Sequence, residues 1–108
     1  MKYPIIVNEN GDVEIFNDAH VAAAYLEPID IKDNRYEFFD AHGYRVDATI
    51  VSDGVIRFRR RDPPVFDACS LAEILRQFLS QCGYNVDTGE LGELVSETRK
   101  ILGSQNTY

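Results

Sequence analysis

Hydrophobic and polar positions change their spacing along this 108-residue chain. In the first half, short apolar stretches alternate with turn-forming residues, a pattern typical of β-hairpins. After Pro63 and Pro64, apolar residues recur every three or four positions, which is the spacing of one face of an α-helix. The pattern therefore predicts an α+β domain, with strands in the first half and helices at the C-terminal end.

The N-terminal stretch predicts a hairpin and a short helix. Apolar segments at 5–7 and 13–16 flank Asn10-Gly11, a pair that favours a tight hairpin turn. Asp18 follows Asn17 as a helix N-cap, and good helix formers lead from there to Leu26. Pro28 disfavours helical geometry at the residue before it, so we expect the helix to stop there.

The sequence then predicts an antiparallel β-meander of four strands. Turn-forming residues separate them, and the expected strands are Ile29–Lys32, Arg35–Asp40, Tyr44–Val51 and Val55–Arg60. Keeping apolar side chains on one face pairs Ile31 with Tyr36 and Ile29 with Phe38 at the first turn. The same criterion pairs Phe38 with Val46, and at the last turn a three-residue loop pairs Ile50 with Ile56 and Ala48 with Phe58.

This register has a consequence for the opposite face of the sheet. It places Asp30, Glu37, Asp47 and Arg59 in one row across four strands. Like charges directly opposite each other weaken a sheet, so three neighbouring carboxylates need a reason. One interpretation is an acidic recognition strip on an open face. The other is a solvated outer surface that Arg59 partly neutralises.

Two helices are expected after the meander. The first has a capping box at Ser70–Glu73 and a stop at Gly83. Its one-face apolar residues are Leu71, Ile74, Leu75, Phe78, Leu79 and Cys82. The second is expected from about Asp87-Thr88 to Gly103, with a buried stripe and, beside it, an exposed acidic ridge. The stripe comprises Leu91, Leu94, Val95, Thr98, Ile101 and Leu102, and the ridge comprises Glu90, Glu93 and Glu97.

The whole chain, residues 1–108, is expected to be one domain with a frayed tail at 103–108. The C-terminal helical hairpin covers one face of the meander, which gives two layers. The other face carries few large apolar residues, chiefly Phe39, Val51 and Val55, and is left to solvent or to an interface.

Charge and composition narrow the classes of function. The net charge is −7, and residues 1–34 alone carry seven acidic and two basic side chains. This balance argues against nucleic-acid binding and is compatible with a basic protein partner. Arg57–Arg61 is the only basic cluster, and a strand with Phe58 inward and Arg57 and Arg59 outward accounts for it. No apolar run approaches the roughly 20 residues of a membrane span, and no signal peptide is evident, so we expect a cytoplasmic protein without a membrane partner.

Residues that carry chemistry form no recognised constellation. The nucleophile elbow, phosphate loop and zinc-ligand patterns are missing, so no catalytic residue, metal or cofactor is expected. Cys69 and Cys82 flank one predicted helix about 20 Å apart, too far for a disulfide, and are expected as small buried hydrophobic residues. A small enzyme using the carboxylates and His42 would need a pocket that joins distant groups, so we expect a protein that is not an enzyme.

Residues 12–60 carry a resemblance to a known class of protein. Its features are an apolar strand, a short alanine-rich helix ending in Tyr25–Asp30 (YLEPID), and an aromatic strand ending in Asp40–Gly43 (DAHG). These segments resemble small immunity proteins of bacterial contact-dependent growth inhibition and related polymorphic toxin systems. The C-terminal helices are generic.

The resemblance implies a non-enzymatic cytoplasmic protein that binds the C-terminal toxin domain encoded beside it, commonly a nuclease. An acidic surface could fill the toxin's nucleic-acid groove or could hold the toxin away from its active site. The expected contact residues are Asp30, Glu37 and Asp47, with Glu90, Glu93 and Glu97 as the competing patch. The alternative is a general protein-interaction module or a subunit of a larger assembly, which a homodimer through the sheet would favour.

Overall fold

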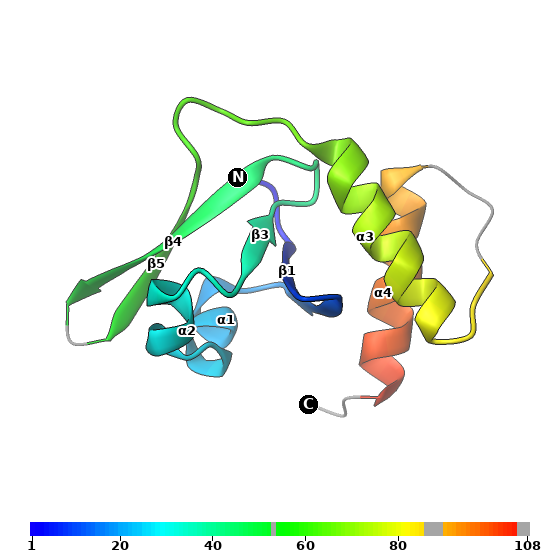
Figure 1. Cartoon of the computed structure of the whole chain (residues 1–108), viewed down its shortest axis with the longest axis horizontal. Coiled ribbons are helices and arrows are strands. Elements are labelled where there is room, and N and C mark those ends of the chain that lie inside the picture. Colours follow the sequence, from blue (N-terminus) through cyan, green and yellow to red (C-terminus); the bar gives the residue numbers. More distant parts are fainter. Residues whose placement is uncertain (53, 86–89, 106–108) are drawn as a thin grey trace.

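A computed structural model describes residues 1–52, 54–85 and 90–105. Five antiparallel strands form one sheet in the order β2-β1-β3-β4-β5, and four helices pack around it (Figure 1). The α+β class, the antiparallel meander and the C-terminal helix pair are therefore confirmed. The strands are β1 (Ile5–Glu9), β2 (Asp12–Phe16), β3 (Glu37–Phe39), β4 (Arg45–Ser52) and β5 (Val55–Arg60). The helices are α1 (Ala19–Tyr25), α2 (Pro28–Lys32), α3 (Ala68–Gln81) and α4 (Leu91–Gln105).

The first hairpin forms as its turn residues predict. Asn10 and Gly11 both have positive φ, at 53° and 96°, as a tight hairpin turn requires. Glu9 pairs with Asp12 across that turn. The strands extend beyond the apolar segments 5–7 and 13–16 as far as Glu9 and Asp12, so these two carboxylates lie next to the turn.

The segment after α1 corrects the expected topology. The Asp18 side chain caps α1 by accepting from the His20 amide at 2.6 Å, as predicted. Residues 29–32, expected as a strand, belong instead to the short helix α2. Pro28 occupies the first turn of that helix, where its missing N–H and fixed φ are favourable. Glu27 is extended, with φ −92° and ψ 126°, as a residue before proline prefers.

Consequently β3 has a different neighbour from the one expected. Val7 on β1 pairs with Phe38, so the pairing of residues 29–32 with β3 was wrong. The remaining register is confirmed: Phe38 pairs with Val46, Ala48 with Phe58 and Ile50 with Ile56. The last hairpin reaches this register through a shift between Ile50 and Ser52, while residue 53 of the expected loop lies outside the described residues.

The sheet is covered on both faces, which gives three layers where the sequence predicted two. Helices α3 and α4 pack over Ile6, Val13 and Phe39, on the face expected to stay open. On the other face, α1 buries Ala22 and Leu26 against the second core. That core comprises Ile5, Val7, Phe16, Ala22, Leu26, Phe38, Val46, Ile56 and Phe58. Because α1 contacts both edge strands, β2 and β5, the sheet curls around it.

The C-terminal helices bury the predicted stripes. Within α3 the side chains of Leu71, Leu75, Phe78 and Leu79 are buried, and within α4 those of Leu94, Val95, Thr98 and Ile101. Gly83 ends α3 with φ 87°, as expected. The capping box at Ser70 was wrong, because the N-cap of α3 is Asp67, three residues earlier, and the helix begins at Ala68. The predicted start of α4 at 87–88 lies outside the described residues, and its end runs to Gln105, so residues 103–105 are helical and not part of a tail.

Candidate protein-binding site

The predicted acidic row does not form across four strands. Asp30 lies on helix α2, where its carboxylate accepts from the Tyr36 hydroxyl at 3.2 Å and pairs with Arg35 at 3.6 Å. It therefore cannot continue a row that begins on the sheet. The correction follows directly from the helical conformation of residues 28–32.

The other two members of the row sit on the sheet but are bound within the protein. Glu37 pairs with Arg45 at 2.9 Å and accepts from the Asn8 amide at 3.0 Å. Asp47 faces Arg59 across the β4–β5 ladder, as predicted, and pairs with Arg61 at 3.0 Å. The cations beside these carboxylates offset most of the negative potential that a recognition strip would need.

The competing ridge occupies α4 and the residue before it. Glu90 and Glu93 are exposed, and Glu97 is half-buried and pairs with Lys100 at 3.2 Å. The ridge thus forms as the helical spacing predicts. Glu93 and Glu97 lie on helix α4, and Glu90 directly precedes it.

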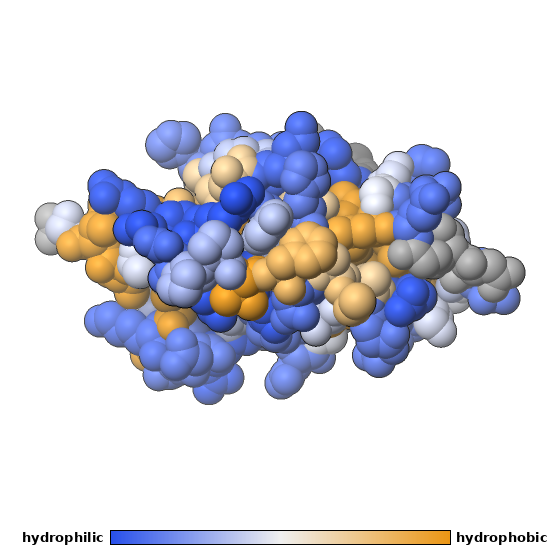
Figure 2. Space-filling model, turned by 90° about the horizontal axis from the view of Figure 1, so that it is seen from above, coloured by the Kyte–Doolittle hydropathy of each residue, from blue (hydrophilic) through white to orange (hydrophobic). Residues whose placement is uncertain are grey.

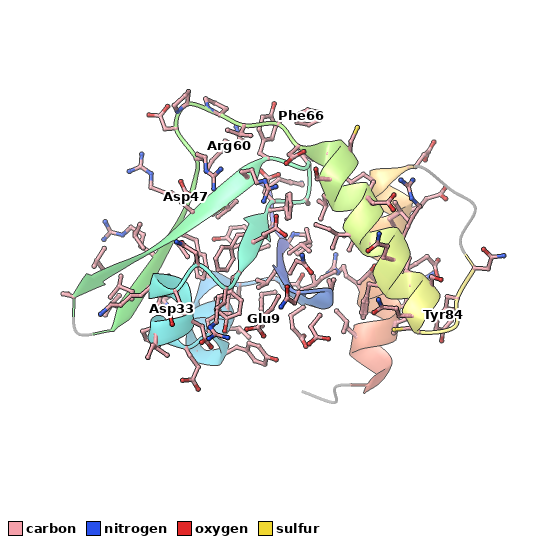
Figure 3. The ribbon with its side chains drawn as sticks, viewed as in Figure 1. Glu9, Asp33, Asp47, Arg60, Phe66 and Tyr84 are labelled. Atoms are coloured by element: carbon pink, nitrogen blue, oxygen red, sulfur yellow. The ribbon has the colours of Figure 1, made fainter. Side chains whose placement is uncertain are left out.

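A different group of carboxylates surrounds a cavity of about 490 Å³ beside the β1–β2 hairpin. Its acidic lining consists of Glu9, Asp12, Glu14 and Glu27, and none of the described residues that line it is basic. We call this feature the acidic cavity. Figure 3 shows Glu9 between the short helices and the long helices, well away from Asp47 beside β4.

The acidic cavity is built by the first hairpin, by residues 25–27 and 36, and by the ends of helices α3 and α4. The hairpin supplies Val7 and three of the carboxylates. Tyr25 at the end of α1, Glu27 before α2 and Tyr36 before β3 form one wall. The opposite wall comes from the ends of the long helices, through Phe78, Gln81, Cys82 and Leu102. The pairing of β1 with both β2 and β3 is what brings these segments together.

The carboxylates of the acidic cavity lack the cations that neutralise the predicted row. None of the four forms a salt bridge with any residue in the described ranges. Arg35 lines a neighbouring hollow with Glu9 and Asp12, but its guanidinium pairs with Asp30 and Asp33. The local potential is therefore strongly negative.

The pKa values of two lining residues reflect this environment. The pKa of Glu14 is raised above 4.5, chiefly by burial and further by the charge of Asp12, against a hydrogen bond from Tyr25 that lowers it. The pKa of Tyr36 is raised above 10.0 by burial first, then by Asp30 and Glu9. Burial is the first cause of both shifts, so the ionised forms of Glu14 and Tyr36 are disfavoured chiefly because they are partly removed from water, and nearby carboxylates add to this effect.

The acidic cavity suits the binding of a cationic side chain better than catalysis. Carboxylates attract an ammonium or guanidinium group, and tyrosine rings add cation–π attraction. Within the described residues, no three His, Cys, Asp or Glu side chains come together as a metal site. His42 lies in a turn, its backbone amide donates to the Asp40 carboxylate, and it is not among the described residues that line the acidic cavity.

The sequence contained one indication of this site that went unused. The excess of acidic residues is largest in positions 1–34, and three of the cavity carboxylates, at 9, 12 and 14, lie within six residues of each other in the first hairpin. The structure leaves Cys69 exposed and Cys82 half-buried, both as free thiols, so the expectation of burial was wrong for Cys69.

The rest of the surface is mixed in character. Seen from above, hydrophobic side chains gather at the β4–β5 tip and over the β5–α3 connection (Figure 2), where Val51, Val55, Val65 and Phe66 are exposed. Arg57 and Arg59 point outward and Phe58 inward, as predicted. No helix in the described part of the chain is long and apolar enough to cross a bilayer.

Comparison with known proteins adds no relative. No family model matches this chain, and neither the curated protein sequences nor the solved structures contain a match. Function must therefore be argued from the residues and from the geometry of the acidic cavity.

Proposed function

We propose that this chain is an immunity protein that binds and neutralises a cognate toxin domain in the cytoplasm, and that the acidic cavity receives a basic part of that toxin. The resemblance of residues 12–60 to immunity proteins supports the class of function. The observation that carries the site is the group of four carboxylates around one hollow without a salt bridge among the described residues.

Electrostatics explains how such a site would work. A basic surface, such as a nuclease uses to hold phosphates, is attracted to unpaired carboxylates before contact, which speeds association. On contact, a lysine or arginine that enters the cavity replaces water around Glu14 and gains a charged partner. The Asp30, Glu37 and Asp47 carboxylates contribute less in this proposal, because a toxin would have to compete with Arg35, Arg45 and Arg61 for them.

Growth rescue tests the function. The C-terminal domain of the large protein encoded next to this gene is expressed with and without this chain, and surviving cells are counted. We expect survival only in the presence of this chain, together with a complex that co-purifies. If the neighbouring domain kills equally in both cases, the immunity function is wrong for that pair, and the general interaction module becomes the better proposal.

A matched pair of variants tests the site. The Glu14→Gln/Glu27→Gln variant removes two charges from the cavity, and Glu93→Gln/Glu97→Gln removes two from the α4 ridge. We expect the cavity variant to associate about 10-fold more slowly at low salt and to lose much of the salt dependence, as for a steered encounter. The ridge variant should bind like the unaltered protein. The reverse result would assign the interface to α4.

A further inference from the structure

Helix α1 presents hydrophobic side chains to solvent directly beside the acidic cavity. Val21 and Tyr25 are 56% and 52% exposed, and one turn of helix separates them. Ala22 and Leu26 bury the other side of the same helix against the curled sheet. The outer side of α1 therefore presents Val21 and about half of the Tyr25 side chain to solvent.

Tyr25 belongs both to this helix face and to the acidic cavity. Its ring centroid lies 5.3 Å from that of Phe16, which is buried in the second core. Its hydroxyl donates a hydrogen bond to Glu14, and its side chain lines the cavity. The ring is thus held in position before any partner arrives, which lowers the entropy cost of binding.

Charge complementarity defines the kind of partner that fits this face. The apolar face adjoins four carboxylates, so it favours a hydrophobic segment that also carries positive charge. Val55 and Phe66, two exposed hydrophobic residues elsewhere, differ in this respect. Val55 lies two residues from Arg57 on β5. Phe66 packs on the ring of Tyr44, and the Arg60 guanidinium lies 4.2 Å from the centroid of that ring. With arginines beside them, those two places offer no excess of negative charge to the same segment.

We infer that the exposed face of α1 and the acidic cavity form one docking surface for a basic, amphipathic segment of the partner protein. A hydrophobic side chain of that segment packs on Val21, and a neighbouring arginine extends over the Tyr25 ring towards Glu14 and Glu27. Arginine suits the position because its planar guanidinium stacks on aromatic rings and binds carboxylates through two N–H groups. This inference rests on the proposed function in taking the toxin domain as the natural source of the segment.

A peptide probe tests the surface without the toxin. The probe is a short synthetic helix-forming peptide with arginines flanking leucines, and the control peptide replaces each arginine by citrulline, which has the same shape without charge. In a nitrogen-15 NMR titration, we expect shifts at residues 14, 21, 25 and 27 with the arginine peptide and at least 10-fold weaker shifts with the citrulline peptide. Equal shifts at residues 55–59, or none on α1, would overturn the inference.

Variants of the full chain then test the surface in the toxin complex. Val21→Ser and Tyr25→Ala should weaken the complex about 10-fold and about 30-fold, as expected for a peripheral contact and a central aromatic anchor. Val55→Ser is the matched control for Val21→Ser, because Val55 is 55% exposed, and it should bind normally. Tyr25→Phe keeps the ring and should recover most of the affinity lost in Tyr25→Ala.

The two proposals fail in different ways. If the neighbouring domain is not neutralised but the arginine peptide still binds at α1, the immunity function is wrong and the docking surface stands. If the toxin is neutralised and the Val21 and Tyr25 variants bind it as tightly as the unaltered protein, the function stands and this surface is wrong.

Discussion

Two groups of carboxylates differ in the side chains beside them. The stabilising group, Glu37, Asp40, Asp47 and Asp67, pairs with arginines, whereas the group around the acidic cavity does not pair with any described cation. Arg45 holds both Glu37 and Asp67, with nitrogen–oxygen distances of 2.9 and 2.8 Å, and its guanidinium lies 4.4 Å from the centroid of the Phe39 ring. The carboxylates of the cavity have no comparable cation in the described ranges. The first group therefore stabilises the fold, and the second leaves its charge available to a partner.

The same difference appears in the pKa values of one member of each group. Hydrogen bonds from Ser70 and Arg45 lower the pKa of Asp67 below 3.8. Burial, with Asp12 nearby, raises the pKa of Glu14 above 4.5. Ionisation is thus favoured where the carboxylate joins the sheet to α3 and disfavoured where it lines the cavity. A small acidic domain can use one residue type for both purposes, because the neighbouring cations decide which applies.

Asp40 is the most extreme member of the stabilising group, and its removal should have the largest effect. Its side chain is fully buried and accepts from the backbone amides of His42 and Tyr44, at 2.9 and 3.0 Å, and from the Lys2 amide and Arg60, both at 3.4 Å. We expect Asp40→Ala to lower the free energy of unfolding by about 3 kcal/mol, since it leaves a cation and three backbone amides without their acceptor.

Urea denaturation measures this change. Glu9→Gln is the control from the cavity group and should alter the unfolding free energy by less than about 0.5 kcal/mol. A loss below about 1 kcal/mol in Asp40→Ala would contradict the structural role, and an equal loss in both variants would remove the distinction between the groups.

Arg45 should have the second largest effect. Its side chain is 18% exposed and binds two carboxylates, whereas Arg61 is 45% exposed and binds Asp47 alone. We expect Arg45→Leu to lower the unfolding free energy by about 2 kcal/mol, because it leaves Glu37 and Asp67 unpaired beside the sheet. Arg61→Leu should change it by less than about 0.5 kcal/mol, as for an exposed ion pair. Similar losses of unfolding free energy in the two variants would show that the link from Arg45 to Glu37 on β3 and Asp67 at the start of α3 does not stabilise the fold.

The local hairpins could be predicted from the sequence, and the pairing between distant strands could not. The Asn10-Gly11 turn fixes the first hairpin, and the apolar alternation fixes Phe38 opposite Val46. Pro28 was correctly recognised as a restriction on Glu27, but proline is also favoured at the first position of a helix. That second property makes residues 28–32 helical and leaves β1 as the neighbour of β3.

The acidic cavity was missed for the same physical reason. Its lining comes from residues 7–14, 25–27 and 36, and from the ends of α3 and α4. Tyr36 reaches the hairpin because β3 pairs with β1. The sequence predicted residues 29–32 as the neighbour of β3 instead. The ion pairs that occupy Glu37 and Asp47 are likewise set by tertiary contacts with Arg45 and Arg61, which strand alternation does not reveal.

The pH dependence of stability should separate the two groups by sign, with the smallest effect of the three. A raised pKa means that folded Glu14 binds its proton more tightly than unfolded Glu14 does. Stability from this residue is therefore present below pH 4.5 and is lost as the pH rises through the folded pKa. Glu14→Gln should raise the unfolding free energy at pH 7 by less than about 1 kcal/mol, since the site is partly solvated, and should have no effect near pH 4.

For Asp67 the pKa is lowered, so its contribution is present above pH 3.8 and is lost as the pH falls through the folded pKa. Asp67→Asn should accordingly destabilise the protein at pH 7. Urea denaturation between pH 3 and pH 8 measures both variants against the unaltered chain. If both variants have a lower unfolding free energy than the unaltered chain at pH 7, Glu14 also stabilises the fold. That result would contradict the proposal that its charge is available to a partner.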